Sequence, residues 1–219
     1  VTVFEIARAA KIICPDIIQA HDYYNSMIAA CLPIHIPIIC HLHNNAPWIK
    51  NYGFKSTIFA LSCMRYKEIL TVSDSICEEY IWGKYIQKKT KTIGNPIDTN
   101  EIIKKSEVGI ETDPFEIAYI GRLSVPKNPV RFLHIIKHIQ SFLPNITCKM
   151  IGDGELKEKI LDEINILGLK CTIEILGFKE NPYSILKNGK ILCITSDWEG
   201  FGLVAVEALA LGVPVVCTN

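Results

Sequence analysis

The sequence predicts an α/β protein whose parallel sheets are covered by helices on both faces. Short apolar runs alternate with amphipathic stretches of helical length along the whole chain, which is typical of this class. Hydrophobic residues make up 49% of the 219 residues, with only 13 Gly and 11 Pro, so the chain has enough apolar side chains for a full core. Disordered, collagen-like and small disulfide-bonded proteins are therefore excluded.

The charges are balanced, with 23 Lys and Arg against 23 Asp and Glu, which argues against a nucleic-acid partner. The longest apolar stretch, 27–42, is interrupted by two prolines and two histidines, so we expect any membrane contact to be peripheral. Nine cysteines without a CxxC pair favour buried free thiols in a reducing compartment. We therefore expect a cytoplasmic protein, and contact with the inner face of the cell membrane stays open.

The first half of the chain begins with a predicted helix followed by a strand, which is how a βαβ unit ends. Helices are predicted at 1–14, 25–31, 57–66 and 73–83, and strands at 17–20, 36–41 and 68–72. Because the chain also opens on Val1 without an initiator Met or a signal sequence, we expect it to be a piece of a longer protein.

A charged stretch without apolar periodicity, 99–114, predicts a linker between two domains, 1–98 and 115–219. Strand and helix signals then resume. Strands are predicted at 115–120, 147–151, 172–176, 191–195 and 213–217, and helices at 130–142, 156–167, 182–186 and 203–211.

Glycine and polar residues follow four consecutive predicted strands of the second domain. They are Gly121-Arg122, Gly152-Asp153-Gly154, Gly177-Phe178 and Ser196-Asp197-Trp198-Glu199-Gly200. Because the carboxyl ends of parallel strands meet at one edge of a sheet, these residues predict one ligand site. Glycines that only form turns would explain a single cluster equally well, but they explain four in register less well.

The two glutamates Glu199 and Glu207 flank the predicted start of the last helix. If that helix begins near Phe201, Glu207 lies two turns beyond Glu199 on the same face. The amino end of a helix favours an anion such as a diphosphate, whereas carboxylates beside it suit hydroxyl groups. Arg122 and Lys127 supply positive charge, and the combination of sites predicts a nucleotide-sugar ligand.

These motifs resemble the donor half of a family 4 glycosyltransferase of the GT-B fold. The matching segments are 118–123 with Lys127, 151–154, 176–178, 196–202 with Glu207-Ala208, and 212–216. More loosely, 15–21, 42–43, 71–76 and 93–98 resemble the last part of that family's acceptor domain. The resemblance implies two Rossmann-like parallel-sheet domains that face a cleft, both incomplete here. Asn128 stands where the family commonly has glycine.

The resemblance also implies roles for individual residues. Arg122 and Lys127 would bind the donor diphosphate, and Glu207 the ribose hydroxyls. Glu199, with the backbone of Phe201 and Gly202, would bind the transferred sugar, and His43 would stand across the cleft near the anomeric carbon. The same donor site would include Gly121, Gly177, Phe178 and Leu203. The family retains anomeric configuration and generally needs no metal, so we expect neither a metal nor a separate cofactor.

The implied reaction moves a sugar from a nucleotide-sugar donor to a glycan or lipid-linked acceptor, in bacterial surface polysaccharide synthesis. Two alternatives stay open: a nucleotide-sugar 2-epimerase or hydrolase of the same fold, and a noncatalytic remnant. By the resemblance, the 219 residues lack the first acceptor-domain strand and the segment after Asn219. We therefore expect them to be inactive by themselves.

The histidines give only a weak metal signal. His41 and His43 are two apart at a predicted strand end, so their side chains share a face, but no carboxylate or cysteine at ligand spacing accompanies them. His21 and Asp22 follow another strand and suit either the acceptor side or a structural role. The sequence therefore favours no metal site.

Overall fold

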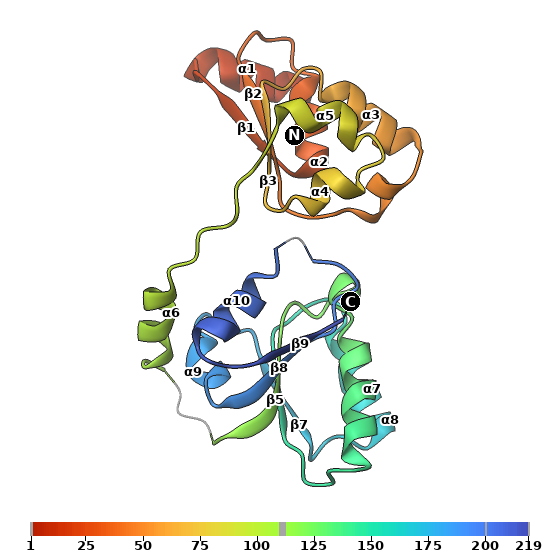
Figure 1. Cartoon of the computed structure of the whole chain (residues 1–219), viewed down its shortest axis with the longest axis vertical. Helices are drawn as coiled ribbons and strands as arrows, with labels where there is room; N and C mark the ends of the chain where they lie inside the picture. The colour runs from red at the N-terminus through yellow and green to blue at the C-terminus, as the bar shows by residue number, and fades with distance from the viewer. Residues whose placement is uncertain (1, 110–112, 200, 219) are drawn as a thin grey trace. The chain divides into compact units, whose positions relative to one another are not determined.

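The computed structural model describes residues 2–109, 113–199 and 201–218 and divides into two compact units (Figure 1). The first unit comprises residues 1–95 and 199–201, and the second comprises 96–198 and 202–219. Each unit contains one parallel sheet, which confirms the predicted α/β class. Within the described part of the chain, no helix combines the length and the apolar character needed to cross a membrane.

The first unit contains a four-stranded parallel sheet in the order β1-β2-β3-β4. Its strands are β1 (Ile18–His21), β2 (Ile38–Leu42), β3 (Glu68–Thr71) and β4 (Thr90–Thr92). The helices are α1 (Val3–Ile13), α2 (Asp22–Ala30), α3 (Phe54–Ser62), α4 (Ser75–Glu79) and α5 (Gly83–Ile86), with short 3-10 turns at Pro47–Lys50 and Gln87–Lys89. The first three strands lie where the apolar runs predict them. The short, exposed β4 was not predicted.

The predicted single helix over 73–83 is wrong, because the chain breaks it into α4 and α5. Tyr80 ends α4 with an extended backbone (ψ 124°), and its buried hydroxyl donates a hydrogen bond to the Ser56 carbonyl at 2.6 Å. This tertiary contact competes with helix continuation, and it involves a residue 24 positions earlier that no local pattern reveals.

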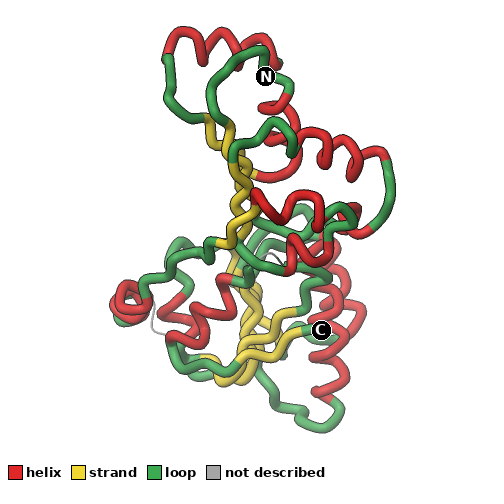
Figure 2. The backbone as a smooth tube through the Cα atoms, turned by 45° about the horizontal axis from the view of Figure 1, so that its top comes forward, coloured by secondary structure: helices red, strands yellow, loops and turns green. Residues whose placement is uncertain are grey.

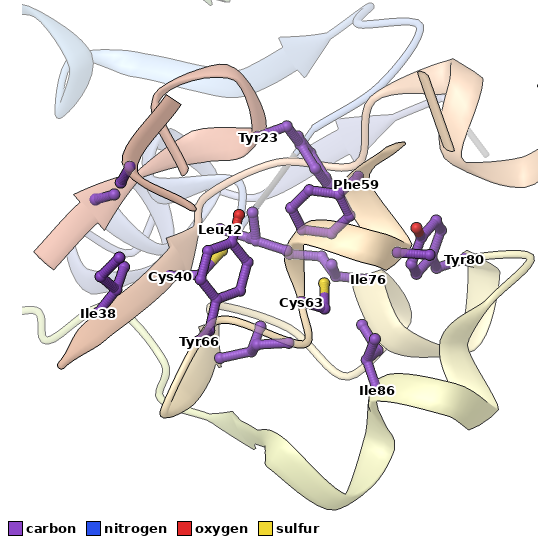
Figure 3. Close-up of a cluster of buried hydrophobic side chains, with 14 of the residues drawn as sticks. Tyr23, Ile38, Cys40, Leu42, Phe59, Cys63, Tyr66, Ile76, Tyr80 and Ile86 are labelled. Atoms are coloured by element: carbon purple, nitrogen blue, oxygen red, sulfur yellow. The ribbon is translucent and has the colours of Figure 1, made fainter. Parts of the chain in front are cut away.

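The core of the first unit is rich in aromatic side chains (Figure 3). Phe59 is fully buried, and its ring makes edge contacts with Tyr23 and Tyr80 at centroid distances of 4.9 and 5.6 Å. Two buried thiols lie in the same cluster, and burial raises the pKa of Cys40 to about 12. All nine cysteines are free as predicted, but not all are buried. The exposed ones are Cys14, Cys31, Cys171 and Cys217.

The second unit has a five-stranded parallel sheet whose order, β7-β6-β5-β8-β9, reverses at β5. Its strands are β5 (Phe115–Ile120), β6 (Cys148–Ile151), β7 (Ile173–Gly177), β8 (Gly189–Ile194) and β9 (Val215–Cys217). The helices are α6 (Thr99–Ser106), α7 (Pro129–Gln140), α8 (Lys157–Leu167), α9 (Tyr183–Leu186) and α10 (Leu203–Ala210), and a 3-10 turn spans Val125–Lys127. Such a reversal opens a crevice at the carboxyl ends of the strands, where α/β proteins bind ligands.

Helices cover both faces of this sheet (Figures 1 and 2). One core cluster joins α7 and α8 to the sheet through residues such as Phe132 and Ile160. A second cluster joins α9 and α10 to the other face through residues such as Leu186 and Ala208. Apolar side chains of the strands therefore pack against helices on both faces of the sheet. This is why the strands appear as continuous apolar runs in the sequence.

The prediction of a linker over 99–114 is wrong for its first half, because 99–106 form α6. The Asp98 carboxylate caps this helix by accepting a hydrogen bond from the Glu101 amide at 3.1 Å. Ile102 is buried, and α6 packs against α9 and α10. One buried apolar residue in a charged octapeptide is too weak a periodic signal to read without the partner helices. Residues 110–112 lie outside the described part of the chain.

Candidate functional site

A pocket of about 570 Å³ lies at the carboxyl edge of the second sheet. Three of its walls are the segments that follow β5, β6 and β7, and the others come from the start of α9 and from α10. The lining residues are Ile120, Gly121, Arg122, Ile151, Gly152, Asp153, Gly154, Phe178, Lys179, Glu180, Pro182, Tyr183 and Glu207. This strand-end pocket brings together residues from three of the four predicted strand-end clusters.

The glycines of the pocket allow two loops to touch backbone to backbone. Gly152 has φ +147°, and a Cβ atom there would lie 1.9 Å from the carbonyl oxygen of Gly121. The Gly121 amide donates to the Ile151 carbonyl at 3.0 Å, and the Leu123 amide donates to the Asp153 carbonyl at 3.0 Å. Any larger side chain at Gly152 would separate these loops, so the glycine shapes the pocket wall directly.

Arg122 is the most exposed cation of the pocket. Its side chain is 72% exposed, and its Nε lies 3.3 Å from Oε2 of Glu155. An ion pair this exposed contributes little to stability, so it does not prevent the guanidinium from binding a ligand anion. On the opposite loop, Lys157 approaches Asp153 to 2.8 Å and holds the pKa of that carboxyl below its usual range.

Glu207 projects from α10 into the pocket lining and is held by Tyr183. The Tyr183 hydroxyl donates a hydrogen bond to Oε1 of Glu207 at 3.1 Å. Burial and the neighbouring Glu207 charge raise the pKa of Tyr183 to about 12, so the hydroxyl keeps its proton. A carboxylate can accept about four hydrogen bonds, which leaves Glu207 able to accept more from a ligand with adjacent hydroxyls.

Tyr183 is a site residue that the sequence did not indicate. It lies 24 positions before Glu207, at the start of a four-residue helix, and no motif links the two. The signal that could have found it is a tyrosine, an aromatic residue with a hydroxyl group, directly after Asn181-Pro182 in the segment that follows the third strand end.

The loop that carries Lys127 is fastened to the end of β8. The Thr195 hydroxyl donates to the carbonyl oxygens of Lys127 and Asn128 at 3.2 and 3.0 Å. The Asn128 amide donates to Asp197 at 3.2 Å, and the Arg131 guanidinium reaches the same carboxylate at 2.8 Å. Asn128 has φ +44°, a left-handed conformation that asparagine tolerates better than most residues, which explains why it can stand where glycine is common.

Six predicted donor-site residues do not line the strand-end pocket: Lys127, Gly177, Glu199, Phe201, Gly202 and Leu203. Gly177 ends β7 directly before Phe178, which does line it. Gly202, in the left-handed region with φ +72°, precedes the first residue of α10, Leu203. The helix therefore starts two residues after Phe201. Glu199 precedes the helix, as predicted, but the start near Phe201 that would place it on the same face as Glu207 is not observed. Gly200 lies outside the described residues.

The remaining predicted residue, His43, lies in the first unit. It follows β2 and contacts His21, whose Nδ1 is 2.8 Å from Nε2 of His43. His41 is the third member of this group, and burial, followed by the charges of His43 and His21, lowers its pKa. The sequence predicted His41 and His43 on one face, but not His21 beside them.

The volume of a pocket does not by itself identify the functional site. A larger hollow, of about 980 Å³, lies in the first unit over residues 74–92. The described residues that line it include no run of glycine-rich strand ends. The strand-end pocket is distinguished by its position at the reversal of strand order and by the glycine-rich strand ends that line it.

Two family models match consecutive parts of the chain. The model described as glycosyl transferases group 1 matches residues 100–219, and the model described as glycosyltransferase family 4 matches residues 2–101. The chain belongs to the group 1 glycosyltransferases. The fold is GT-B, as the resemblance to family 4 glycosyltransferases implied.

Relatives agree with this assignment. The chain is 28% identical to an uncharacterized glycosyltransferase of Methanocaldococcus jannaschii, covering 99% of this chain and 58% of that protein. It is 24% identical to a UDP-Gal:α-D-GlcNAc-diphosphoundecaprenol α-1,3-galactosyltransferase of Escherichia coli, covering 93% and 58%. The crystal structure of Anabaena HepE with UDP and glucose matches with a TM-score of 0.80 at 22% identity, covering 98% and 62%. The chain thus spans 58% of the length of either curated relative.

Proposed function

We propose that the chain forms part of a retaining glycosyltransferase that moves a sugar from a nucleotide-sugar donor to a glycan or lipid-linked acceptor. The observation that carries this proposal is the strand-end pocket, where Arg122 and Glu207 line one cavity at the reversal of strand order. Glycine-rich strand ends of this kind let backbone amides approach a ligand closely.

We assign the parts of the donor to the candidate residues by their charge and hydrogen-bonding capacity. Glu207, held by Tyr183, accepts hydrogen bonds from ribose hydroxyls. Arg122 binds the diphosphate, and Lys127 on the fastened loop adds a second positive charge. We assign the transferred sugar to Glu199 with the backbone of Phe201 and Gly202, and a role at the anomeric carbon to His43.

The chemistry that these groups supply is stabilisation of the leaving nucleoside diphosphate. Negative charge develops on the diphosphate as the glycosidic bond to the nucleotide breaks, and fixed positive groups lower the free energy of that transition state. The amino end of α10 contributes in the same sense, because its free backbone amides favour an anion. We therefore propose that the reaction proceeds without a divalent metal ion on the phosphates.

The donor and acceptor classes are supported by relatives. HepE was crystallised with UDP and glucose, and the Escherichia coli relative is named for a UDP-galactose donor and a lipid-linked diphosphoundecaprenol acceptor. We propose a nucleoside diphosphate sugar as donor and a lipid-linked glycan as acceptor. The enzyme then works in bacterial surface polysaccharide synthesis, in the cytoplasm, at the inner face of the membrane where such lipids are exposed.

Titration calorimetry of the protein expressed from its native gene with UDP, GDP and their sugars tests the donor site directly. We expect one nucleoside diphosphate to bind to wild type and to the Glu163→Ala variant, whose substitution lies on α8 outside the pocket lining. Binding of neither nucleotide, in a chain shown to be folded by circular dichroism, would overturn the proposal.

Turnover separates the transferase from its alternatives. In the protein expressed from its native gene, a transferase forms product only when an acceptor is present. Product formation from the nucleotide-sugar alone would indicate an epimerase or a hydrolase. Nucleotide binding without turnover on any acceptor would indicate a noncatalytic protein.

A further inference from the structure

One ion pair joins the start of α7 to the segment that follows β8, within the second unit. Nη2 of Arg131 lies 2.8 Å from the Asp197 carboxylate, and Nη1 donates to the Thr195 carbonyl at 3.1 Å. Two nitrogens of one guanidinium therefore bind the same strand end. Because the guanidinium is planar, two such contacts fix its orientation as well as its position.

Asp197 contacts both chain neighbours of Lys127. Its backbone amide donates to the Pro126 carbonyl at 2.8 Å, and its two carboxylate oxygens accept hydrogen bonds from the Asn128 side chain at 3.2 and 3.3 Å. The Asn128 side chain also caps α7, because its oxygen accepts a hydrogen bond from the Arg131 amide at 3.2 Å. The Lys127 loop, residues 124–128, is thus bound to Asp197 on both sides of Lys127.

The Lys127 loop has little apolar packing of its own. None of the three described residues of its 3-10 turn is buried, and Val125 is 63% exposed. The buried Thr195 hydroxyl adds hydrogen bonds to two of the loop's carbonyl oxygens. A segment with few buried apolar contacts opens at a low cost in free energy, so polar contacts such as these set its conformation.

The ion pair itself contributes little to the overall stability of the unit. The side chains of Arg131 and Asp197 are 40% and 34% exposed, and solvent weakens a pair of this exposure. Its contacts are concentrated on the Lys127 loop instead. Arg131 also offsets the negative charge of Asp197, which would otherwise disfavour an anion beside this loop.

We propose that Asp197 and Arg131 are positioning residues for Lys127. Together they hold the Lys127 loop in the conformation in which the Lys127 ammonium binds the donor diphosphate. Neither Asp197 nor Arg131 contacts the donor in this proposal, and both act through the loop. The inference rests on the proposed function, in which Lys127 supplies a second positive charge to the diphosphate.

The direction of one effect separates positioning from charge. Asp197→Asn keeps the shape of the side chain and removes its negative charge. By charge alone, the loss of a carboxylate near an anion site should strengthen binding of a nucleoside diphosphate. If Asp197 positions Lys127, the same substitution should weaken binding, because an amide cannot accept hydrogen bonds at both of its ends.

Titration calorimetry with UDP and GDP, on the protein expressed from its native gene, measures this effect. We expect Asp197→Asn to weaken binding of the nucleotide that wild type binds by about 10-fold, a typical coupling within one hydrogen-bond network. In a Lys127→Met background the same substitution should change the affinity by less than about 2-fold, because no cation is left to position.

Glu116→Gln is the matched control for these titrations. It removes a carboxylate of similar exposure, 37%, from another ion pair of the second unit, the one with Lys190. The nucleotide affinity of this variant should equal that of wild type. An equal loss in Glu116→Gln and Asp197→Asn would overturn the inference, because the effect would then not depend on the Lys127 loop.

Hydrogen exchange measured by mass spectrometry tests the position of the loop without a ligand. Amides of 124–128 should exchange faster in Asp197→Asn than in wild type, whereas those of β5 should be unchanged. Unchanged exchange in the loop, unchanged or tighter nucleotide binding in Asp197→Asn, or an equal loss in the Lys127→Met background would overturn this inference alone. Absence of binding of either nucleotide to wild type would overturn the proposed function and this inference with it.

Discussion

The carboxyl edges of the two sheets differ in what lines them, although both sheets are parallel. In the second unit the edge consists largely of backbone, because Gly121, Gly152 and Gly154 let neighbouring loops meet without side chains between them. In the first unit the edge of β1 and β2 is lined by side chains, namely those of His21, His41, His43 and Asp22. A backbone edge leaves room for a large ligand, whereas a side-chain edge brings ring nitrogens together.

The two sheets also differ in the order of their strands. The described strands of the first unit run 1-2-3-4 without reversal, whereas those of the second unit reverse at β5. At a reversal the loops after neighbouring strands leave in opposite directions and open a crevice. The strand-end pocket of the second unit lies on this edge, so we place the nucleotide-sugar there.

The first prediction tests whether the two units are energetically separate. Phe59→Ala removes a fully buried ring from the aromatic core of the first unit and should lower the free energy of unfolding of that unit by about 3 to 5 kcal/mol. Urea unfolding measures the loss. Phe54→Ala, at an 83% exposed position of the same helix, should change stability by less than about 0.5 kcal/mol. Loss of UDP binding in the Phe59→Ala variant would show that the units depend on one another.

The second prediction concerns the backbone edge of the second unit. Gly152→Ala places a methyl group 1.9 Å from the Gly121 carbonyl oxygen and should destabilise this unit by about 3 kcal/mol, with loss of nucleotide binding. Gly168→Ala is the matched control. It also has positive φ, +67°, but no atom lies within 4 Å, so it should cost only about 1 kcal/mol. Similar losses for both in urea unfolding would mean that conformation alone, not loop contact, requires Gly152.

The third prediction separates the two glutamates. Glu207→Ala removes the acceptor for two ribose hydroxyls and should weaken nucleoside diphosphate binding by about 1.5 to 3 kcal/mol. Glu199→Ala should leave that binding unchanged and lower turnover, because its proposed contact is with the sugar. Calorimetry and a transferase assay measure the two effects. If both substitutions weaken nucleotide binding equally, the assigned roles are wrong.

The fourth prediction compares the two cations of the second unit. Arg122→Lys replaces a planar guanidinium, which can bind two phosphate oxygens at once, with a single ammonium. It should weaken UDP binding by about 1.5 to 3 kcal/mol, the loss of one hydrogen bond to a charged group. Lys127→Arg keeps the charge and should have a smaller effect. Isothermal titration of both variants with UDP measures the difference. A larger loss at Lys127 would transfer the main phosphate contact to the loop fastened by Thr195.

The smallest effect is expected from chelation. EDTA should leave turnover largely unchanged, because Arg122, Lys127 and the amino end of α10 replace a divalent ion on the donor phosphates. Initial rates with and without EDTA measure this. Activity that EDTA abolishes and Mn²⁺ restores would contradict the metal-free phosphate chemistry.

Strands with strong apolar runs were predictable, and elements stabilised mainly by distant contacts were not. The apolar run 115–120 coincides with β5, because a central strand is buried on both faces and its residues show it locally. The helix α6 was hidden because its stability comes from α9 and α10. The break between α4 and α5 was hidden because it depends on the hydrogen bond from Tyr80 to Ser56.

In the candidate site, too, some features were predictable from the sequence and others depended on distant contacts. The sequence by itself determined the α/β class, the glycine-rich strand ends and the candidate residues Arg122 and Glu207, because these follow from local patterns of residue type. Only the tertiary structure decided that Tyr183 holds Glu207 and that His21 joins His41 and His43. Such partners are set by the register of strands and the docking of helices, which bring together residues about 20 or more positions apart that no local pattern links.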